Sequence, residues 1–180
     1  MGIIVNGSLY TGKSGFSGEI GHMPYFQNEV LCHCGKKGCL ETEVSGSALL
    51  RIVKEHLAKG EQSLLSRKAK ESELTLANIL DALDKEDTLC IDCISQMGEK
   101  LGRFLSGMIN IFNPEKLIIG GELSRDGGYI TQTVRTSIKK YALHLVSEDS
   151  VIETSKLQGE AGVIGAAMIA RSKLFTDDYI

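Results

Sequence analysis

The longest periodic run of apolar residues lies between residues 87 and 112. Its apolar side chains recur at intervals of three and four, which is the spacing of one helical face. They are Ile94, Met97, Leu101, Leu105, Met108 and Phe112. The pattern predicts one long helix that buries this stripe and ends at Asn113-Pro114. Glycines lower helix propensity, so we expect those in this helix to pack closely against a neighbour. They are Gly98, Gly102 and Gly107.

Two shorter helices precede the long one. Ser45 is a good N-cap for a helix that runs to about Ala58 and ends at Gly60. Its apolar positions recur at helical spacing and are Leu49, Leu50, Val53 and Leu57. Residues 59–74 are polar and mixed in charge, which favours a surface connection with a short helix. Thr75 then begins a brief helix that continues through Leu83.

Strand patterns occur at both ends of the chain. Two short β-rich runs flank Asn6-Gly7, a strong two-residue turn signal, so residues 2–12 are predicted to form a hairpin. Residues 116–121 are apolar without alternation, which predicts a strand buried on both faces. Another strand is expected over 151–155.

Helices are also predicted near residues 130–143 and over 159–174. The second of these carries small residues that give it a slim face for packing: Gly162, Gly165 and Ala166. No internal repeat or low-complexity tract is found. We therefore treat residues 1–180 as a single domain. Residues 11–40 form a glycine-rich loop, and the candidate binding motifs occupy residues 11–46.

Composition narrows the class of protein. Hydrophobic residues make up 42% of the 180 residues and charged residues 24%, which is typical of a globular protein. The net charge of -3 does not point to nucleic acid or to an anionic membrane. No apolar run approaches the roughly 20 residues of a membrane span, and the first residues do not resemble a signal peptide. We expect a cytoplasmic protein, in which clustered cysteines bind metal more often than they form disulfides.

Three of the five cysteines lie within the stretch "LCHCGKKGCLETEVSG", residues 31–46. Cys32, Cys34 and Cys39 surround two glycines that can turn the loop so that its thiolates point inward. Three thiolates and one imidazole form a closed tetrahedral set that suits a structural Zn²⁺. His22 is favoured as the fourth ligand over His33, because a more distant ligand fixes more of the chain. The alternative is a cluster of reduced thiols without metal.

Cys90 and Cys93 form a second pair, Cys-x-x-Cys, within the predicted long helix. A redox role is one interpretation. The other is that both are small core residues, which we favour because no turn between a strand and a helix precedes them.

The stretch "SGFSGEIGHM" followed by "CHCGKKGCLETEVSG" resembles the signature of the ROK family (repressor, open reading frame, kinase), and the likeness continues through "NIFNPEKLIIGGELS" and "GEAGVIGAAMIA". This resemblance implies an α/β fold, namely an actin-like ATPase (ribonuclease H-like) lobe that is truncated at its N-terminus and carries an inserted zinc loop. It also implies that His22, Cys32, Cys34 and Cys39 bind zinc. The family's sugar-binding positions correspond to Glu19, His22 and Glu41, so a monosaccharide or amino sugar is the expected ligand.

The same resemblance implies that family kinases bind ATP where Gly120 and Gly121 follow the predicted strand. Kinase members often carry a third glycine, but here Glu122 stands in its place, which weighs against nucleotide binding. The kinases' general-base aspartate belongs to a segment upstream of the Glu-x-Gly-His motif. No aspartate lies among the 18 residues before Glu19, so we assign no catalytic residue and expect this polypeptide alone to be inactive as a kinase.

We expect the chain to be the C-terminal part of a longer protein, starting one strand into a lobe. Two functions follow from the resemblance: the effector domain of a sugar-responsive repressor of the NagC/XylR type, and the C-terminal lobe of an ATP-dependent sugar kinase. We favour the repressor, which would reach DNA only through an N-terminal segment absent here. A sheet edge left open at residues 2–7 also predicts a homo-oligomer.

Overall fold

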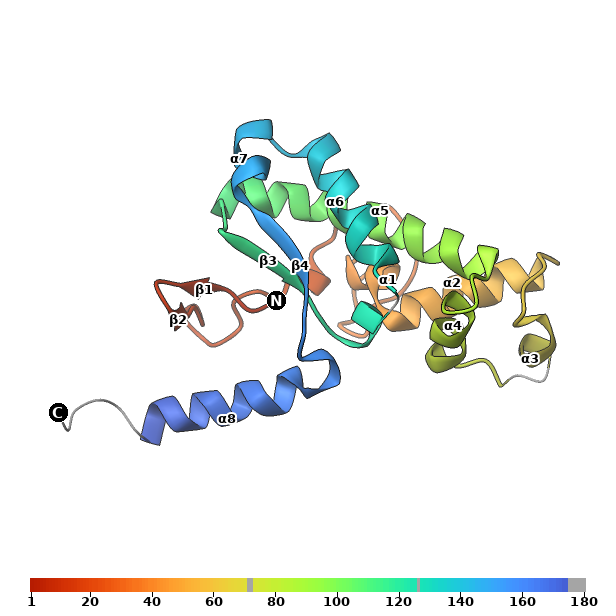
Figure 1. Ribbon diagram of the computed structural model, residues 1–180, viewed down its shortest axis with the longest axis horizontal. Helices are drawn as coiled ribbons and strands as arrows, with labels where there is room; N and C mark the ends of the chain where they lie inside the picture. Colours follow the sequence, from red (N-terminus) through yellow and green to blue (C-terminus); the bar gives the residue numbers. More distant parts are fainter. Residues whose placement is uncertain (71–72, 126, 175–180) are drawn as a thin grey trace.

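The computed structural model describes residues 1–70, 73–125 and 127–174. Within them, helices pack around one long central helix, α5 (Thr88–Phe112), and two small sheets lie to one side (Figure 1). The hairpin β1 (Ile4–Val5) and β2 (Ser8–Leu9) is antiparallel, as predicted, and turns at Asn6 and Gly7, both at positive φ. The parallel pair β3 (Lys116–Ile119) and β4 (Val151–Thr154) forms the other sheet.

Helix α5 begins and ends where the sequence predicts. Asp87 caps its N-terminus by accepting a hydrogen bond from the Cys90 backbone N–H at 3.0 Å, and Asn113 ends it in the left-handed conformation. Most of the predicted stripe is buried or packed against the core. Phe112 was expected to be buried as well, but it is 50% exposed. It lies in the last turn of α5, beyond the part that α6 (Tyr129–Tyr141) covers.

Two glycines of α5 permit the closest helix contact in the fold. A Cβ placed on Gly102 would lie 2.5 Å from the Cβ of Ser137, and one on Gly98 would lie 2.9 Å from the Cβ of Thr133. Both neighbours belong to α6, which packs along α5 (Figure 1). The prediction of close packing is therefore confirmed for these two. It is wrong for Gly107, where a Cβ would meet nothing within 4 Å.

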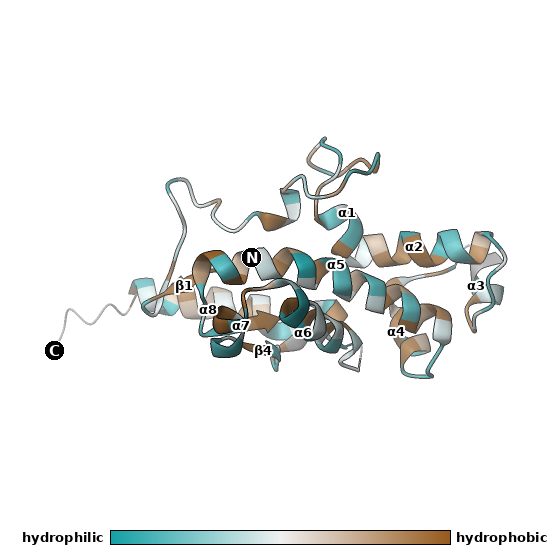
Figure 2. Ribbon diagram, turned by 90° about the horizontal axis from the view of Figure 1, so that it is seen from above, coloured by the Kyte–Doolittle hydropathy of each residue, from teal (hydrophilic) through white to brown (hydrophobic). Residues whose placement is uncertain are grey.

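The helices at the other end of α5 follow the predicted boundaries. α2 (Gly46–Ala58) is capped by Ser45, whose hydroxyl accepts from the Ala48 N–H, and α4 (Leu76–Leu83) begins with a capping box at Thr75. A short α3 (Ser66–Lys70) lies in the polar connection. Figure 2 shows apolar residues on the sides of α2, α4 and α5 that face one another. Two short helices were not predicted: α1 (Glu41–Val44) and α7 (His144–Asp149).

The strand β3 differs from its prediction. It was expected to be buried on both faces, but only Ile119 is buried, whereas Ile118 is 61% exposed. α6 packs against β4 on one face, whereas Ile118 and Val151 on the other face are exposed. An apolar run without alternation therefore predicts a strand that is apolar on both faces. It does not show that other elements cover both faces.

Helix α8 (Ala161–Leu174) forms as predicted but extends away from the rest of the described chain (Figure 1). None of its residues is buried, and Val163 is 76% exposed. The expected packing against its small residues is wrong for the described chain, because a Cβ on Gly162 or Gly165 would meet nothing within 4 Å. Apolar residues surround this helix instead of forming one stripe, which is typical of a helix enclosed by partners. No helix in the described part of the chain is long and apolar enough to cross a membrane.

Asp87 links the connection between α2 and α3 to the N-terminus of α5. Its Oδ2 accepts from the Leu64 backbone N–H at 2.7 Å and from the Ser63 hydroxyl at 2.9 Å, while Oδ1 caps α5. Burial raises the pKa of this carboxyl, but the hydrogen bonds from Leu64, Cys90 and Ser63 together hold it below its ordinary value. The ionised form is thus favoured in the folded chain.

Replacing Asp87 by alanine should lower the free energy of unfolding by roughly 1–2 kcal/mol, because the cap is lost and the Leu64 N–H loses its partner. Since the folded pKa lies below the unfolded one, Asp87 contributes its full stability above about pH 4 and loses it as the pH falls further. Urea unfolding at pH 7 and pH 3 measures both effects. Asp84→Ala, an exposed control, should change stability by less than about 0.5 kcal/mol. A difference between Asp87→Ala and wild type that stays the same at both pH values would contradict the assignment.

Candidate metal and sugar site

The segment between the hairpin and α1 is held by short hydrogen-bonded contacts. After a single 3₁₀ turn, η1 (Ile20–His22), the chain forms isolated bridges between Pro24 and Cys39 and between Leu31 and Lys37. The Gly38 carbonyl accepts from two consecutive backbone N–H groups, those of Tyr25 and Phe26, at 2.8 and 2.9 Å. These contacts bring His22 beside the cysteine loop.

Glycine is required at one position of this loop. Gly38 has φ +74°, and a Cβ there would lie 2.2 Å from the Phe26 carbonyl oxygen. A larger residue would therefore separate the two strands of the loop. Gly35 also has positive φ, at +83°, and forms the turn between Cys32 and Lys36. The predicted glycine-shaped turn is thus present.

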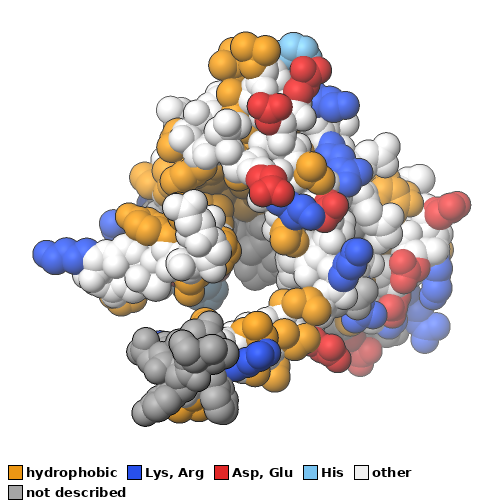
Figure 3. Space-filling view, turned by 60° about the vertical axis from the view of Figure 1, so that its left-hand side comes forward, with side chains coloured by type: hydrophobic (Ala, Val, Ile, Leu, Met, Phe, Trp, Pro, Cys, Tyr) orange, Lys and Arg blue, Asp and Glu red, His pale blue; other side chains and the backbone are white. Residues whose placement is uncertain are grey.

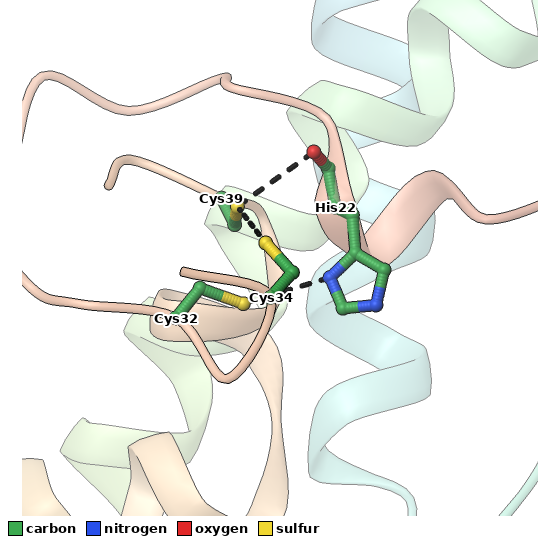
Figure 4. A group of neighbouring side chains, drawn as sticks. All are labelled: His22, Cys32, Cys34 and Cys39. Carbon is green, nitrogen blue, oxygen red and sulfur yellow. Dashed lines mark hydrogen bonds between the residues drawn. The ribbon is translucent and has the colours of Figure 1, made fainter. Parts of the chain in front are cut away.

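The four predicted zinc ligands converge (Figure 4). Their ligand atoms all lie within 4.8 Å of one another. Cys34 Sγ is 3.6 Å from Cys39 Sγ, and Cys32 Sγ is 3.5 Å from His22 Nδ1. Bond lengths of about 2.3 Å to sulfur and 2.0 Å to nitrogen in a tetrahedral site would separate two sulfur atoms by about 3.8 Å and a sulfur from a nitrogen by about 3.5 Å. The donor set and its spacing therefore fit a zinc ion.

The thiols also differ in burial and in the direction of their pKa shifts. Cys39 is fully buried, and this burial raises the pKa of its thiol to about 12. At Cys34 a hydrogen bond from the Lys36 backbone N–H lowers the thiol pKa. His33, the rival fourth ligand, is exposed and lies outside the converging group. All five cysteines are free thiols, so no disulfide occupies the loop.

The two ring nitrogens of His22 lie near different carboxylates. Its Nε2 lies 3.8 Å from a carboxylate oxygen of Glu19, while Nδ1 lies 3.5 Å from Glu41 Oε2. The His22 side chain is 39% exposed, and both carboxylates are also accessible. The three residues that match the family's sugar-binding positions thus form one accessible group next to the cysteines. Carboxylates accept hydrogen bonds from hydroxyl groups, and these bonds are charge-assisted.

A polar network behind the site was not predicted from the sequence. Glu43 on α1 is hydrogen bonded to Asn28 Nδ2 at 2.8 Å and forms an ion pair with Lys100 of α5 at 2.5 Å. Arg51 of α2 donates to the Thr42 carbonyl at 2.9 Å. The network attaches α1, which carries Glu41, to α2 and to α5. The stretch "ETEVSG" contains Glu43, but a single polar residue beside a motif carries no periodic signal.

The remaining predicted site residues lie elsewhere. Gly120 and Gly121 follow β3 directly, and Gly121 has φ +88° with open space where a Cβ would be. Glu122 begins the 3₁₀ turn η2 (Glu122–Arg125) immediately after them.

Cys90 and Cys93 are 0% and 2% exposed. Burial raises the pKa of both thiols, that of Cys93 to about 11, so neither provides the thiolate that redox exchange requires. Their placement agrees with the interpretation as core residues.

Known proteins match this chain along nearly its whole length. The glucokinase of Halalkalibacterium halodurans is 31% identical over 174 residues, which cover 96% of this chain and 53% of the glucokinase. The xylose repressor of Caldicellulosiruptor bescii is 34% identical over 179 residues, which cover 99% of this chain and 45% of the repressor. The chain therefore spans about half the length of the relatives it matches.

A solved structure matches at the level of the fold. The ROK family glucokinase of Streptomyces griseus, in complex with glucose and AMPPNP, superposes with a TM-score of 0.84 and 28% identity over 95% of this chain and 56% of that one. This agrees with the predicted α/β fold of the actin-like ATPase class. The model of the ROK family matches residues 1–173. The chain belongs to the ROK family.

Proposed function

We propose that this chain is the sugar-binding, zinc-containing effector part of a sugar-responsive ROK regulator. The observation that carries the proposal is the two-sided placement of His22, with Cys32 at its Nδ1 and Glu19 at its Nε2. Glu41 completes an accessible group of hydrogen-bonding partners for sugar hydroxyls. A monosaccharide or amino sugar is the ligand that this chemistry fits.

In this proposal the zinc ion is structural. When bound, it would hold the three thiolates and the Nδ1 atom of His22 and supply no reactive group of its own. Fixing Nδ1 on the metal leaves Nε2 free to meet a sugar hydroxyl and prevents the ring from turning. The loop would then present Glu19, His22 and Glu41 in one fixed arrangement.

The choice of a regulator rests on Glu122. A phosphate bound against the Gly120–Gly121 backbone would meet this carboxylate at the start of η2, and like charges repel. No aspartate precedes Glu19 in this chain. We therefore infer that the 180 residues do not phosphorylate a sugar. In the regulator, DNA would be bound by a segment outside this chain.

A kinase lobe is the second candidate. The open backbone at Gly121 and the similarity to glucokinases favour it. Calorimetric titration with the non-hydrolysable ATP analogue AMPPNP distinguishes the two candidates. Absence of binding, in a chain that binds sugar, supports the regulator. Binding that is lost in Gly121→Val would support the kinase lobe.

Sugar binding itself is testable with the same chain. Titration with glucose, xylose and N-acetylglucosamine should give binding to at least one of them, with a Kd of about 1 mM or tighter. Glu41→Ala should weaken that binding about tenfold or more, because it removes a charge-assisted acceptor. Glu148→Ala on α7 removes a more exposed carboxylate elsewhere and should leave affinity unchanged. Equal losses in both variants would contradict the assigned site.

We also propose that the chain associates with a second copy. Apolar side chains are exposed along β1, β3 and α8, and Figure 3 shows hydrophobic side chains along the arm that α8 forms. A cavity of about 680 Å³ lies between the hairpin and the end of α5; its apolar lining includes Val5, Tyr10, Met108, Ile111 and Phe112. Unpaired strand edges and apolar surfaces of this kind bind other chains.

Light scattering on the purified chain at micromolar concentration should therefore give at least twice the monomer mass of 19.5 kDa. The double variant Ile118→Lys/Val163→Lys, which charges two exposed apolar positions, should shift the mass toward the monomer. Leu64→Lys, at an exposed apolar residue between α2 and α3, is the matched control and should not. A monomeric wild-type chain would contradict the association.

A further inference from the structure

A second cleft lies beside the Tyr25–Phe26 segment. Its volume is about 540 Å³, within the range of small-molecule sites. It is lined by Tyr25, Phe26, Gln96, Glu99, Lys100, Arg103 and Tyr141. These residues come from the loop after η1, from the middle of α5 and from the end of α6. None of them belongs to the proposed zinc or sugar site.

The walls of this cleft are aromatic and held in place. Tyr25 makes edge-on contacts with Phe26, at 5.1 Å between ring centroids, and with the buried Phe104 of α5, at 5.2 Å. The backbone N–H groups of Tyr25 and Phe26 are both bound to the Gly38 carbonyl. The rings are therefore fixed by the loop and by α5, and Tyr25 stays 40% exposed. Fixed, exposed rings offer a planar ligand a surface at little entropic cost.

The charges of the cleft favour an anion. Its lining carries two cations, Lys100 and Arg103, and one carboxylate, Glu99, while Lys140 lies beside the cleft, over the Tyr141 ring. Glu43 pairs with Lys100 at 2.5 Å, and Glu99 lies 3.7 Å from Lys140. Arg103 has its guanidinium 5.4 Å above the Tyr141 ring, and no carboxylate of the described chain forms an ion pair with it.

Arg103 is therefore the charged group that remains for a ligand. Its planar guanidinium presents parallel N–H donors that match a phosphate or carboxylate group. The Tyr141 ring beneath it orients the guanidinium through a cation–π contact. The aromatic walls next to it suit a ring attached to that anionic group.

We propose that this cleft binds a small anion that carries a planar ring, with Arg103 holding the phosphate or carboxylate and Tyr25 and Tyr141 contacting the ring. The site is separate from the sugar-binding group, so the proposal does not depend on the function proposed above.

Calorimetric titration of the 180-residue chain with phenyl phosphate tests the proposal, with inorganic phosphate and phenol as partial ligands. Phenyl phosphate should bind at least tenfold more tightly than either. Arg103→Ala should weaken phenyl phosphate binding about tenfold or more, whereas Arg171→Ala, the same charge change on α8, should leave it unchanged. Tyr141→Leu should abolish the preference for phenyl phosphate over inorganic phosphate.

Three results would overturn the proposal. They are absence of phenyl phosphate binding by the wild-type chain, equal binding of phenyl phosphate and inorganic phosphate, and unchanged affinity in a folded Arg103→Ala variant. Circular dichroism of each variant establishes folding, and Arg103 is exposed, so its replacement should leave the helices intact.

Discussion

Replacing Cys39 by serine should release about one zinc ion per chain and loosen residues 16–45 while α5 stays folded. Cys39 is fully buried and is one of the four converging ligands, so its loss leaves an incomplete set. Apparent binding free energies of structural zinc are about 10–16 kcal/mol in small zinc domains, and that stabilisation would leave the loop with the metal. Metal analysis by mass spectrometry and amide hydrogen exchange measure the two effects.

The control for this experiment is Cys93→Ser. Cys93 is also buried, but it lies in α5 outside the converging group, so its replacement should lower stability without changing the zinc content. Less than a tenth of a zinc ion per wild-type chain, in protein never exposed to a chelator, would refute the metal site. Stoichiometric zinc in Cys39→Ser would refute the ligand assignment.

Alanine at two glycines of α5 should have opposite effects on stability. Gly102→Ala should lower the free energy of unfolding by about 2–3 kcal/mol, because the new Cβ would lie 2.5 Å from the Ser137 Cβ and 2.8 Å from the Val134 carbonyl oxygen. Gly107→Ala should raise it by about 0.5–1 kcal/mol, since a Cβ there meets nothing within 4 Å and alanine favours the helix.

Thermal unfolding followed by circular dichroism checks this pair. For a chain of this length the expected change is about 2–4 °C per kcal/mol, so Gly102→Ala should melt several degrees below wild type. If both variants shift in the same direction, the contact between α5 and α6 is not the one described.

The pattern of apolar residues was sufficient to predict the helices that pack against the core on one side. The ends of α2, α4 and α5 were predicted because residues such as the Ser45 cap and the Asn113-Pro114 pair mark them locally. The short helices α1 and α7 carry no such signal and were missed. Burial was predicted less well: Phe112 and Ile118 are apolar and correctly placed in their elements, yet both are exposed. Periodicity shows which side of an element is apolar, while burial also depends on which neighbour covers it.

The candidate site was predictable to a similar extent. The residues predicted to bind metal and sugar lie in two neighbouring motifs, which the structure brings together around His22. The supporting pairs of Glu43 with Asn28 and Lys100 could not be predicted, because they join residues up to 57 positions apart in sequence. The anion cleft at Arg103 is likewise formed by three distant segments.

Residues 11–40 bury few of their side chains, and this affects their response to denaturant. Of this stretch only Cys32, Gly38, Cys39 and Leu40 are buried. Unfolding the loop therefore exposes little new apolar area, so it should add little to the denaturant m-value or to the heat capacity of unfolding. A chelator would then dismantle the loop while the urea midpoint of the helical core hardly moves. Metal supply and core stability would be two independent controls on the same chain.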